Sequence, residues 1–294
     1  MTPGELLSDY SLEITVRDVE RLAAARGGIA PQTAVSITFL PGDAGEKVVA
    51  AAVAVRRLGF IPVPHVSARR MRSREELAKL LGDLRDEARI DRVFVIAGDS
   101  SHPLGPYEDA LAVIRSGLLA RYDIRQVGVA GYPQGHPQVP PESLSRAMRE
   151  KLAALTEAGH VAEIVTQFAF DADAVAAWVA RLRADGVDTA IRLGVAGPAT
   201  VQSLLRYAAR CGVGVSAKVL GKYGVSITRL LSAATPDLML SRLGELIDSE
   251  AVGRVKVHLY PFGGLDKLTE WLAAIAAAGG RAHGRAPAQD GAAW

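Results

Sequence analysis

Side chains capable of acid–base chemistry recur in this sequence inside or directly after short apolar runs. The run 93–97 ends in Gly98 and Asp99, and Glu13 stands between Leu12 and Ile14. Such runs are typical of buried parallel strands, with the polar residue delivered near the strand's C-terminal end. Burial raises the pKa of an unpartnered carboxyl group, which would suit Glu13 to act as a general acid. The alternative is an exposed glutamate on a poorly formed first strand.

Other polar side chains lie where further apolar runs end, or in the loops that follow. A fold that places its chemistry at the C-terminal ends of its strands would bring them to one cavity. For Asp99 the alternative is a helix N-cap, for His65 a structural hydrogen bond, and for His136 a turn. The amide of Gln167 can donate and accept, which fits a heterocycle edge as well as a local cap. The candidates are Glu13, Thr38, His65, Asp99, Tyr132, His136, Gln167 and Tyr260.

A basic run stands between two predicted elements and consists of Arg69, Arg70, Arg72 and Arg74. It is typical of the solvated start of a helix, and contact with a phosphate group is the sharper alternative. Cys211 is the only cysteine, which excludes an internal disulfide and a cysteine-based zinc cluster. We expect it to be a small buried hydrophobic residue, and we expect no metal site.

The composition limits the class of protein. The chain has 294 residues, 49% hydrophobic and 22% charged, which is enough for one large globular core. A net charge of +2 is too small to indicate a nucleic acid or a membrane surface as partner. Neither a signal peptide nor an uninterrupted membrane-spanning stretch is seen, so we expect a cytoplasmic protein that acts on a small molecule. Whether it forms a homo-oligomer stays open.

Apolar runs alternate with amphipathic helical segments along most of the chain. The helical segments include 46–58, a helix capped by Ser73, 107–120, a helix begun by Pro140, 171–184, a helix opened by Pro198, and 265–278. The section 213–250 is predicted to be all-helical. Predicted strands cover residues 12–16, 34–39, 61–65, 92–99, 126–130, 163–167, 189–193 and 255–260.

Eight strands, each followed by helix, predict a single-domain (β/α)8 TIM barrel over residues 1–279. The remaining residues, 280–294, are rich in Gly, Ala and Pro and are predicted to form a flexible tail. A doubly wound open sheet is the main alternative. That fold predicts a Gly-rich turn after the first strand, and Glu13 to Asp18 contains no glycine.

Five motifs, in this order, resemble the methylenetetrahydrofolate reductase family. They are Val35-Ser36-Ile37-Thr38-Phe39, Pro64-His65-Val66-Ser67, Ile96-Ala97-Gly98-Asp99, Gly131-Tyr132-Pro133-Gln134-Gly135-His136-Pro137, and the segment from Ala158-Gly159 to Thr166-Gln167-Phe168. Each motif is weak alone, but together they cover most of the predicted barrel. The resemblance weakens after Pro198.

The resemblance implies an enzyme that reduces 5,10-methylenetetrahydrofolate to 5-methyltetrahydrofolate with NADH or NADPH, usually through FAD. It implies that Glu13 protonates N10 of the folate, that Asp99 lies by the flavin and the pterin, and that Gln167 bonds the pterin. Tyr260 is expected to contact the folate. Cofactor-binding positions implied in the same way are Thr38, Phe39, His65, Ala97, Gly98, Asp99, Tyr107, Tyr132, His136 and Lys151.

Several positions depart from the family pattern. Ala97 stands where the family has arginine, and residues 153–156 replace a Lys/Arg-rich stretch that grips the flavin diphosphate. Arg146, Arg149 and Lys151 could substitute from one turn earlier. Near the last strand, Tyr260-Pro261-Phe262-Gly263-Gly264 lacks the family's basic residue. The resemblance favours FAD. Direct hydride transfer from the nicotinamide without flavin, and a non-catalytic folate- or flavin-binding barrel, stay open as alternatives.

Overall fold

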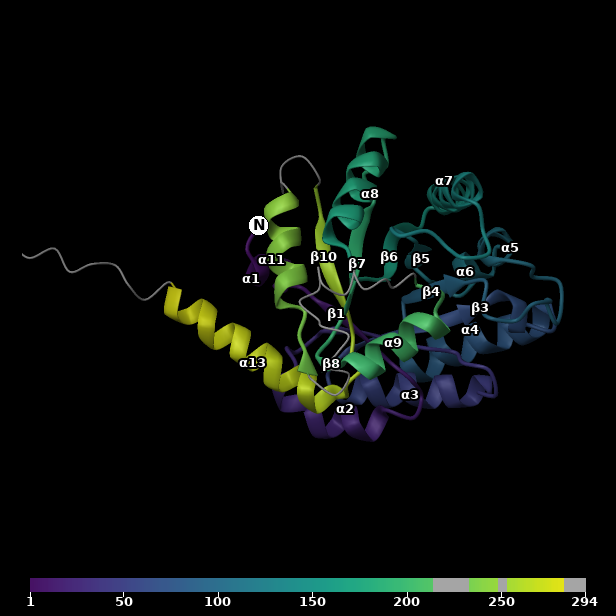
Figure 1. Ribbon diagram of the computed structural model, residues 1–294. Helices are drawn as coiled ribbons and strands as arrows, with labels where there is room; N and C mark the ends of the chain where they lie inside the picture. Colours follow the sequence, from purple (N-terminus) through teal and green to yellow (C-terminus); the bar gives the residue numbers. More distant parts are fainter. Residues whose placement is uncertain (214–232, 248–252, 283–294) are drawn as a thin grey trace, which may run out of the picture.

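The computed structural model describes residues 1–213, 233–247 and 253–282 and contains a closed barrel of eight parallel strands. Neighbouring strands follow the order β1-β10-β7-β6-β5-β4-β3-β2 around the barrel, with helices outside it (Figure 1). This confirms the predicted (β/α)8 architecture. The barrel strands are β1 (Ser11–Ile14), β2 (Ala34–Ile37), β3 (Ile61–Ser67), β4 (Arg92–Ile96), β5 (Gln126–Gly131), β6 (Val161–Ala169), β7 (Ala190–Ala196) and β10 (Val255–Tyr260).

Helices connect successive strands and cover the outside of the barrel (Figure 1). In α4 the buried residues Leu77, Leu80, Leu81 and Leu84 form the apolar stripe of an amphipathic helix. The helices are α1 (Pro3–Leu6), α2 (Val19–Ala25), α3 (Gly45–Arg57), α4 (Arg74–Ala88), α5 (Ala110–Arg115), α6 (Leu118–Arg121), α7 (Pro141–Glu157), α8 (Ala172–Ala184), α9 (Val201–Arg210), α11 (Asp237–Leu246) and α13 (Leu265–Ala282), with short 3-10 turns η1 (Arg26–Gly28) and η2 (Ala68–Arg70).

The helix caps largely follow the sequence. The Ser73 hydroxyl accepts a hydrogen bond from the N–H of Glu76, as predicted for the start of α4. The reciprocal bond of a capping box is absent there, because the Glu76 carboxylate accepts from the N–H of Arg72 instead. Asp171 caps α8 as predicted.

Several predicted boundaries are wrong. The helix predicted for 107–120 is two short helices, α5 and α6, interrupted at Ser116 and Gly117. The all-helical prediction for 213–250 fails at β9 (Ala233–Ala234), which pairs antiparallel with β8 (Ala199–Thr200), and α9 therefore begins after β8 and not at Pro198. Residues 214–232 and 248–250 of that section lie outside the described residues.

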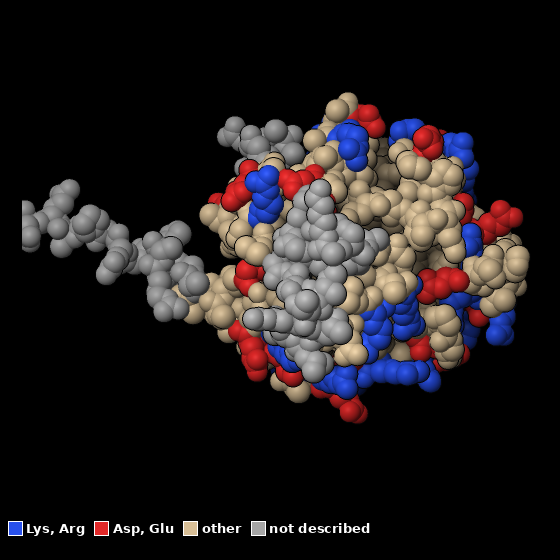
Figure 2. Space-filling model, viewed as in Figure 1, with Lys and Arg blue, Asp and Glu red and all other residues tan. Residues whose placement is uncertain are grey.

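The C-terminal helix is longer than predicted, since α13 continues through Ala282. Apart from the first three residues, the predicted tail lies outside the described residues. Within the described part, no helix is long and apolar enough to cross a membrane. Lys and Arg gather over the lower part of the face in Figure 2, where Figure 1 shows α3 and α9, with Asp and Glu interspersed.

Alternate residues of each strand point into the barrel, and the residues between them face the helices. In a strand such as β10, the inward positions are polar and the outward positions are apolar. In β10, Val255, Val257 and Leu259 pack outward under the helices, while Lys256 and His258 belong to the inward-facing set. A cavity of about 20 Å³ remains inside the barrel near the N-terminal ends of its strands. It is lined by Ser11, Ala34, Ser36, Val63, Arg92, Val93, Phe94, Gln126, Gly128, Glu163, Val165 and Arg192.

Candidate active site

Glu13 lies on β1, which is hydrogen-bonded to β2 on one side and to β10 on the other. Only 21% of its side chain is exposed. The alternative of an exposed glutamate on a poorly formed strand is therefore wrong. Burial raises the pKa of Glu13 to about 8, so the carboxyl group is largely protonated at neutral pH.

Two buried histidines flank Glu13. The Oε2 atom of Glu13 lies 3.5 Å from Nε2 of His65 on β3 and 4.0 Å from Nε2 of His258 on β10. Burial is the main cause that lowers the pKa of both imidazoles to about 3, and the charge of Arg192 contributes to the shift of His258. Both rings are therefore neutral near pH 7, and they meet a protonated acid without forming an ion pair.

His258 is not among the site residues predicted from the sequence, although the residue pattern of its strand contains a signal for it. Its Nδ1 shares a hydrogen bond of 2.7 Å with the hydroxyl of Ser11. The run Val255 to Tyr260 alternates apolar and polar residues, which indicates that Lys256, His258 and Tyr260 share the inner face. Following that alternation would have placed His258 on the inner face of the barrel, whereas its closeness to Glu13 depends on the pairing of β1 with β10.

Two polar atoms of residues that contact β1 are buried without a hydrogen-bond partner among the described residues; Thr38 donates its N–H to the Ile14 carbonyl oxygen, and His65 lies against Glu13. They are Oγ1 of Thr38 and Nε2 of His65. A buried polar atom without a partner is costly, so such atoms indicate where a ligand would bond. The structural hydrogen bond considered for His65 is not made through Nε2.

Gln167 lies within β6 and not at its end, because β6 continues to Ala169. The register with β7 shifts between Val165 and Phe168, which makes a β-bulge around Thr166 and Gln167. Gly194 of β7 allows the bulge, since a Cβ there would lie 2.4 Å from the Thr166 carbonyl oxygen. The Gln167 Oε1 accepts from the Phe168 N–H at 3.1 Å, which orients the amide.

Tyr260 ends β10 beside this bulge. Its hydroxyl donates a hydrogen bond of 3.0 Å to the carbonyl oxygen of Thr166. Burial raises the pKa of Tyr260 well above its usual value, and the charge of Glu13 raises it further. Glu13, Gln167 and Tyr260 therefore belong to one end of the barrel.

Asp99 lies in the loop that follows β4, and its side chain is exposed. Gly98 before it has φ +92, a backbone conformation that favours glycine, and sits against Ser67. The N-cap alternative for Asp99 is wrong, because Asp109 caps the next helix. Burial raises the pKa of Tyr132 and of Cys211; the charge of Asp99 adds to both shifts, and that of Glu13 adds to the shift of Cys211. The charges of both carboxyl groups therefore reach Cys211. We call this region, at the C-terminal ends of the strands, the mouth of the barrel.

The remaining predicted positions surround this mouth less closely. The rings of Tyr132 and His136 lie 5.3 Å apart, and Nδ1 of His136 accepts from the Gln138 N–H, which fits its alternative role in a turn. Burial lowers the pKa of Lys151 on α7, opposed by the charge of Asp109. Phe39 and Tyr107 are buried in the core, and Ala97 is half-buried.

The basic run after β3 is a solvated start of a helix only in its second half, because Arg72 and Arg74 are exposed at the start of α4, whereas Arg69 and Arg70 are half-buried. Arg69, Arg70 and Arg74 each donate hydrogen bonds to backbone carbonyl oxygens of neighbouring segments. No group of three or more potential metal-ligating side chains occurs in the described ranges of the chain.

One family model matches this chain, and its description is methylenetetrahydrofolate reductase. The match covers residues 18–244, which is most of the chain. Asp99 and Gln167 lie within the matched span, whereas Glu13 and Tyr260 lie outside it.

Proposed function

The chain belongs to the methylenetetrahydrofolate reductase family, and we propose that it reduces 5,10-methylenetetrahydrofolate to 5-methyltetrahydrofolate, with NADH or NADPH as reductant and FAD as the bound hydride carrier. One observation carries the proposal. Glu13 is a buried acid with a pKa of about 8, set inside the barrel of a family that acts on a folate. A carboxylic acid that stays protonated at neutral pH can protonate N10 of the substrate.

Glu13 has the surroundings that such an acid needs. Neutral His65 and His258 leave the carboxyl group without a positive partner, so its proton is held until a base of the substrate approaches. Transfer of that proton to N10 opens the five-membered ring and leaves a reactive iminium at N5. Asp99, exposed at the mouth, supplies negative charge that stabilises this developing cation.

Gln167 and Tyr260 orient the folate in this proposal. The Gln167 Oε1 already accepts from Phe168, so the NH2 group of the same amide is left for the pterin edge. The bulge fixes the direction of that amide, because β-bulges re-aim side chains beside active sites. Tyr260 ends β10, which stands opposite β4 and the Asp99 loop in the barrel order.

The residues at the mouth fit a flavin. The unpartnered Oγ1 of Thr38 and Nε2 of His65 are polar atoms that a heterocyclic ring edge could bond. Tyr132, His136 and Gly98 line the loops nearby, and the half-buried ammonium group of Lys151 is the cation that could meet the diphosphate. Bound FAD would supply hydride to the methylene carbon after NAD(P)H had reduced it.

Direct hydride transfer from the nicotinamide is the second candidate, and the side chains near the diphosphate position favour it. Ala97 and the stretch 153–156 of α7 carry no basic group. Arg149 is exposed and lies 3.9 Å from the carboxylate of Asp185, which gives it another partner. In this case the same mouth would hold the nicotinamide ring, and Glu13 would keep its role.

The experiment that tests the proposal is an absorbance spectrum of the freshly purified protein, followed by NADH and NADPH oxidation with methylenetetrahydrofolate. A flavin band together with folate-dependent oxidation supports the FAD route. Undiminished oxidation by a colourless protein, with no gain on adding FAD, supports direct transfer. Folate-induced thermal stabilisation without any oxidation would refute the reductase and support a binding role.

A further inference from the structure

We propose that Arg69 and Arg70 are positioning residues, which fasten the β2–α3 and β4–α5 loops and thereby hold Phe39 and Asp99 in place at the barrel mouth. The two arginines form most of η2, the short turn directly after β3. β3 lies between β2 and β4 in the barrel, so this turn is between the two loops. The inference rests on the proposed function only for the role of Asp99.

Arg69 fastens the β4–α5 loop. Its guanidinium donates to the carbonyl oxygen of Ser100 at 3.0 Å and to that of Glu108 at 2.8 Å. Its backbone N–H donates to the Ala97 carbonyl oxygen at 2.9 Å, and its own carbonyl oxygen accepts from the Leu104 N–H at 2.8 Å. These bonds are spread over the whole loop. Asp99 lies between two of the bonded residues, Ala97 and Ser100.

Arg70 fastens the β2–α3 loop in a similar way. Its guanidinium donates to the carbonyl oxygen of Asp43 at 2.8 Å and lies 4.4 Å from the centre of the Phe39 ring. The Asp43 carboxylate in turn accepts from the Leu40 N–H at 3.0 Å, which closes the turn of this loop. Ser67, just before η2, donates to the Phe39 carbonyl oxygen at 3.4 Å.

A groove of about 740 Å³ lies between the fastened loops and α4. Its lining includes Phe39, Asp43, Arg70, Asp99 and Leu104, so both loops contribute a wall. Residues 97–109 form no helix or strand of their own, so the bonds from Arg69 to both ends of this segment restrict its shape. Hydrogen bonds from a charged donor are the strong ones, so losing those of Arg69 would loosen the loop that carries Asp99.

The test compares Arg69→Ala and Arg70→Ala with Arg74→Ala in the full chain. Arg74 is the matched control, because it comes from the same run and donates to a single carbonyl oxygen, that of Ser116, beyond the loop. Hydrogen exchange read by mass spectrometry follows the amides of 97–109 and of 40–46. We expect Arg69→Ala to speed exchange of 97–109 about tenfold, Arg70→Ala to act on 40–46, and Arg74→Ala to change neither.

Kinetics of folate reduction separate positioning from a purely structural role. We expect Arg69→Ala to lower kcat about tenfold with little change in the KM for the nicotinamide, and Arg69→Lys to recover part of it, since lysine can reach one carbonyl oxygen. Unchanged exchange of 97–109 would overturn the proposal, and so would faster exchange with unchanged kcat. If Arg69→Ala does not fold, Arg69→Lys is judged by the same two criteria.

The proposed function can fail separately. If the unmodified chain reduces no folate under any cofactor condition, the reductase assignment fails. The fastening of the loops is then judged by exchange alone: faster exchange in Arg69→Ala supports it, and unchanged exchange overturns it.

Discussion

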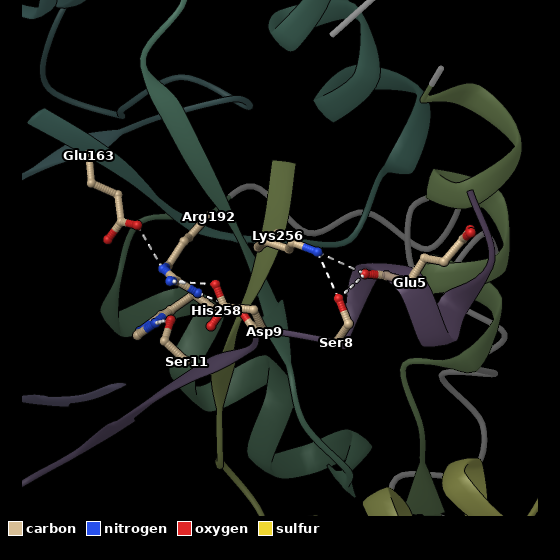
Figure 3. Close-up of polar contacts among 8 residues, drawn as sticks. All are labelled: Glu5, Ser8, Asp9, Ser11, Glu163, Arg192, Lys256 and His258. Carbon is tan, nitrogen blue, oxygen red and sulfur yellow. Dashed lines mark hydrogen bonds and ion pairs between the residues drawn. The ribbon is translucent and has the colours of Figure 1, made fainter. Parts of the chain in front are cut away.

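The two ends of the barrel interior handle their polar side chains in opposite ways. At the N-terminal base, Arg192 donates to Glu163 at 2.8 Å and to Asp9 at 3.2 Å, and Lys256 donates to the Ser8 hydroxyl at 2.7 Å (Figure 3). At the mouth, Glu13 has neutral histidines as neighbours, and polar atoms of Thr38 and His65 have no partner among the described residues.

The difference indicates which end of the barrel is suited to acid–base chemistry. Breaking a buried ion pair is costly because it leaves one charge unpaired, whereas a buried acid that has no charged partner shifts its pKa. Glu13 and Glu163 make the contrast within one barrel: both are inward-facing glutamates, and only Glu163 has an arginine. The polar groups at the mouth are therefore left to bond a ligand, whereas those at the base bond one another.

The largest expected effect comes from exchanging these two acids for amides. We expect Glu13→Gln to reduce folate turnover at least a hundredfold, because the amide cannot donate the proton to N10, while reduction of any bound flavin by NADH is spared. Glu163→Gln should keep turnover within about twofold and lose some stability instead. Steady-state and half-reaction kinetics of the two variants measure this.

Full folate turnover by Glu13→Gln would remove the assigned role of the acid. Comparable losses in both variants would show that the interior responds as one unit and that the contrast between its two ends is wrong.

The base should carry the larger stability effect. Arg192→Met leaves Glu163 without its charged partner, and both side chains are mostly buried, at 12% and 17% exposed. We expect the free energy of unfolding to fall by about 2–3 kcal/mol, with kcat nearly unchanged. Urea unfolding measures it. Arg242→Met is the control, since Arg242 also makes two ion pairs but is half exposed, and its loss should be about 0.5 kcal/mol.

An Arg192→Met protein as stable as the parent would show that the base pairs contribute nothing measurable. An equal loss in Arg242→Met would show that burial does not decide their value.

The pH dependence should distinguish the mouth from the base. The pKa of Glu13 is raised from 4.5 to about 8, so folate turnover should fall about tenfold per pH unit above 8 as the acid loses its proton. Between those two values the folded state holds a proton that the unfolded state releases. The free energy of unfolding therefore decreases as the pH rises through this window.

Glu13→Gln removes that dependence, and its stability relative to the parent should grow from pH 4.5 towards 8. The histidines act in the opposite direction. Their pKa values, lowered from 6.5 to about 3, make the folded state lose stability as the pH falls through that range. Urea titrations at several pH values check both signs. A turnover that stays flat to pH 10 would contradict the assignment of Glu13.

The sequence predicts the barrel well because short apolar runs and strand-end polar residues are local signals. Glu13 and Asp99 could be singled out from their immediate neighbours alone. The caps Ser73 and Asp171 were predictable for the same reason, since the hydrogen bond that defines each lies within three residues.

What could not be predicted depends on contacts between distant segments. The bulge at Gln167 requires Gly194 on the next strand, and the His258 ring approaches Glu13 across the pairing of β1 with β10. Arg69 looks like a solvated residue in sequence, and only the folded loops supply the carbonyl oxygens that it bonds. β9 consists of two alanines, which carry no strand signal.

The smallest expected effect is at the rim of the base. Lys256 donates from an exposed position to the Ser8 hydroxyl and to the Glu5 carbonyl oxygen, at 2.7 and 3.2 Å (Figure 3). We expect Lys256→Met to cost about 0.5–1 kcal/mol of unfolding free energy and to leave turnover unchanged, because water can replace the lost bonds. Urea unfolding beside Arg192→Met gives the comparison. A loss as large as that of Arg192→Met would mean that the N-terminal segment, and not burial of the arginine, sets the stability of the base.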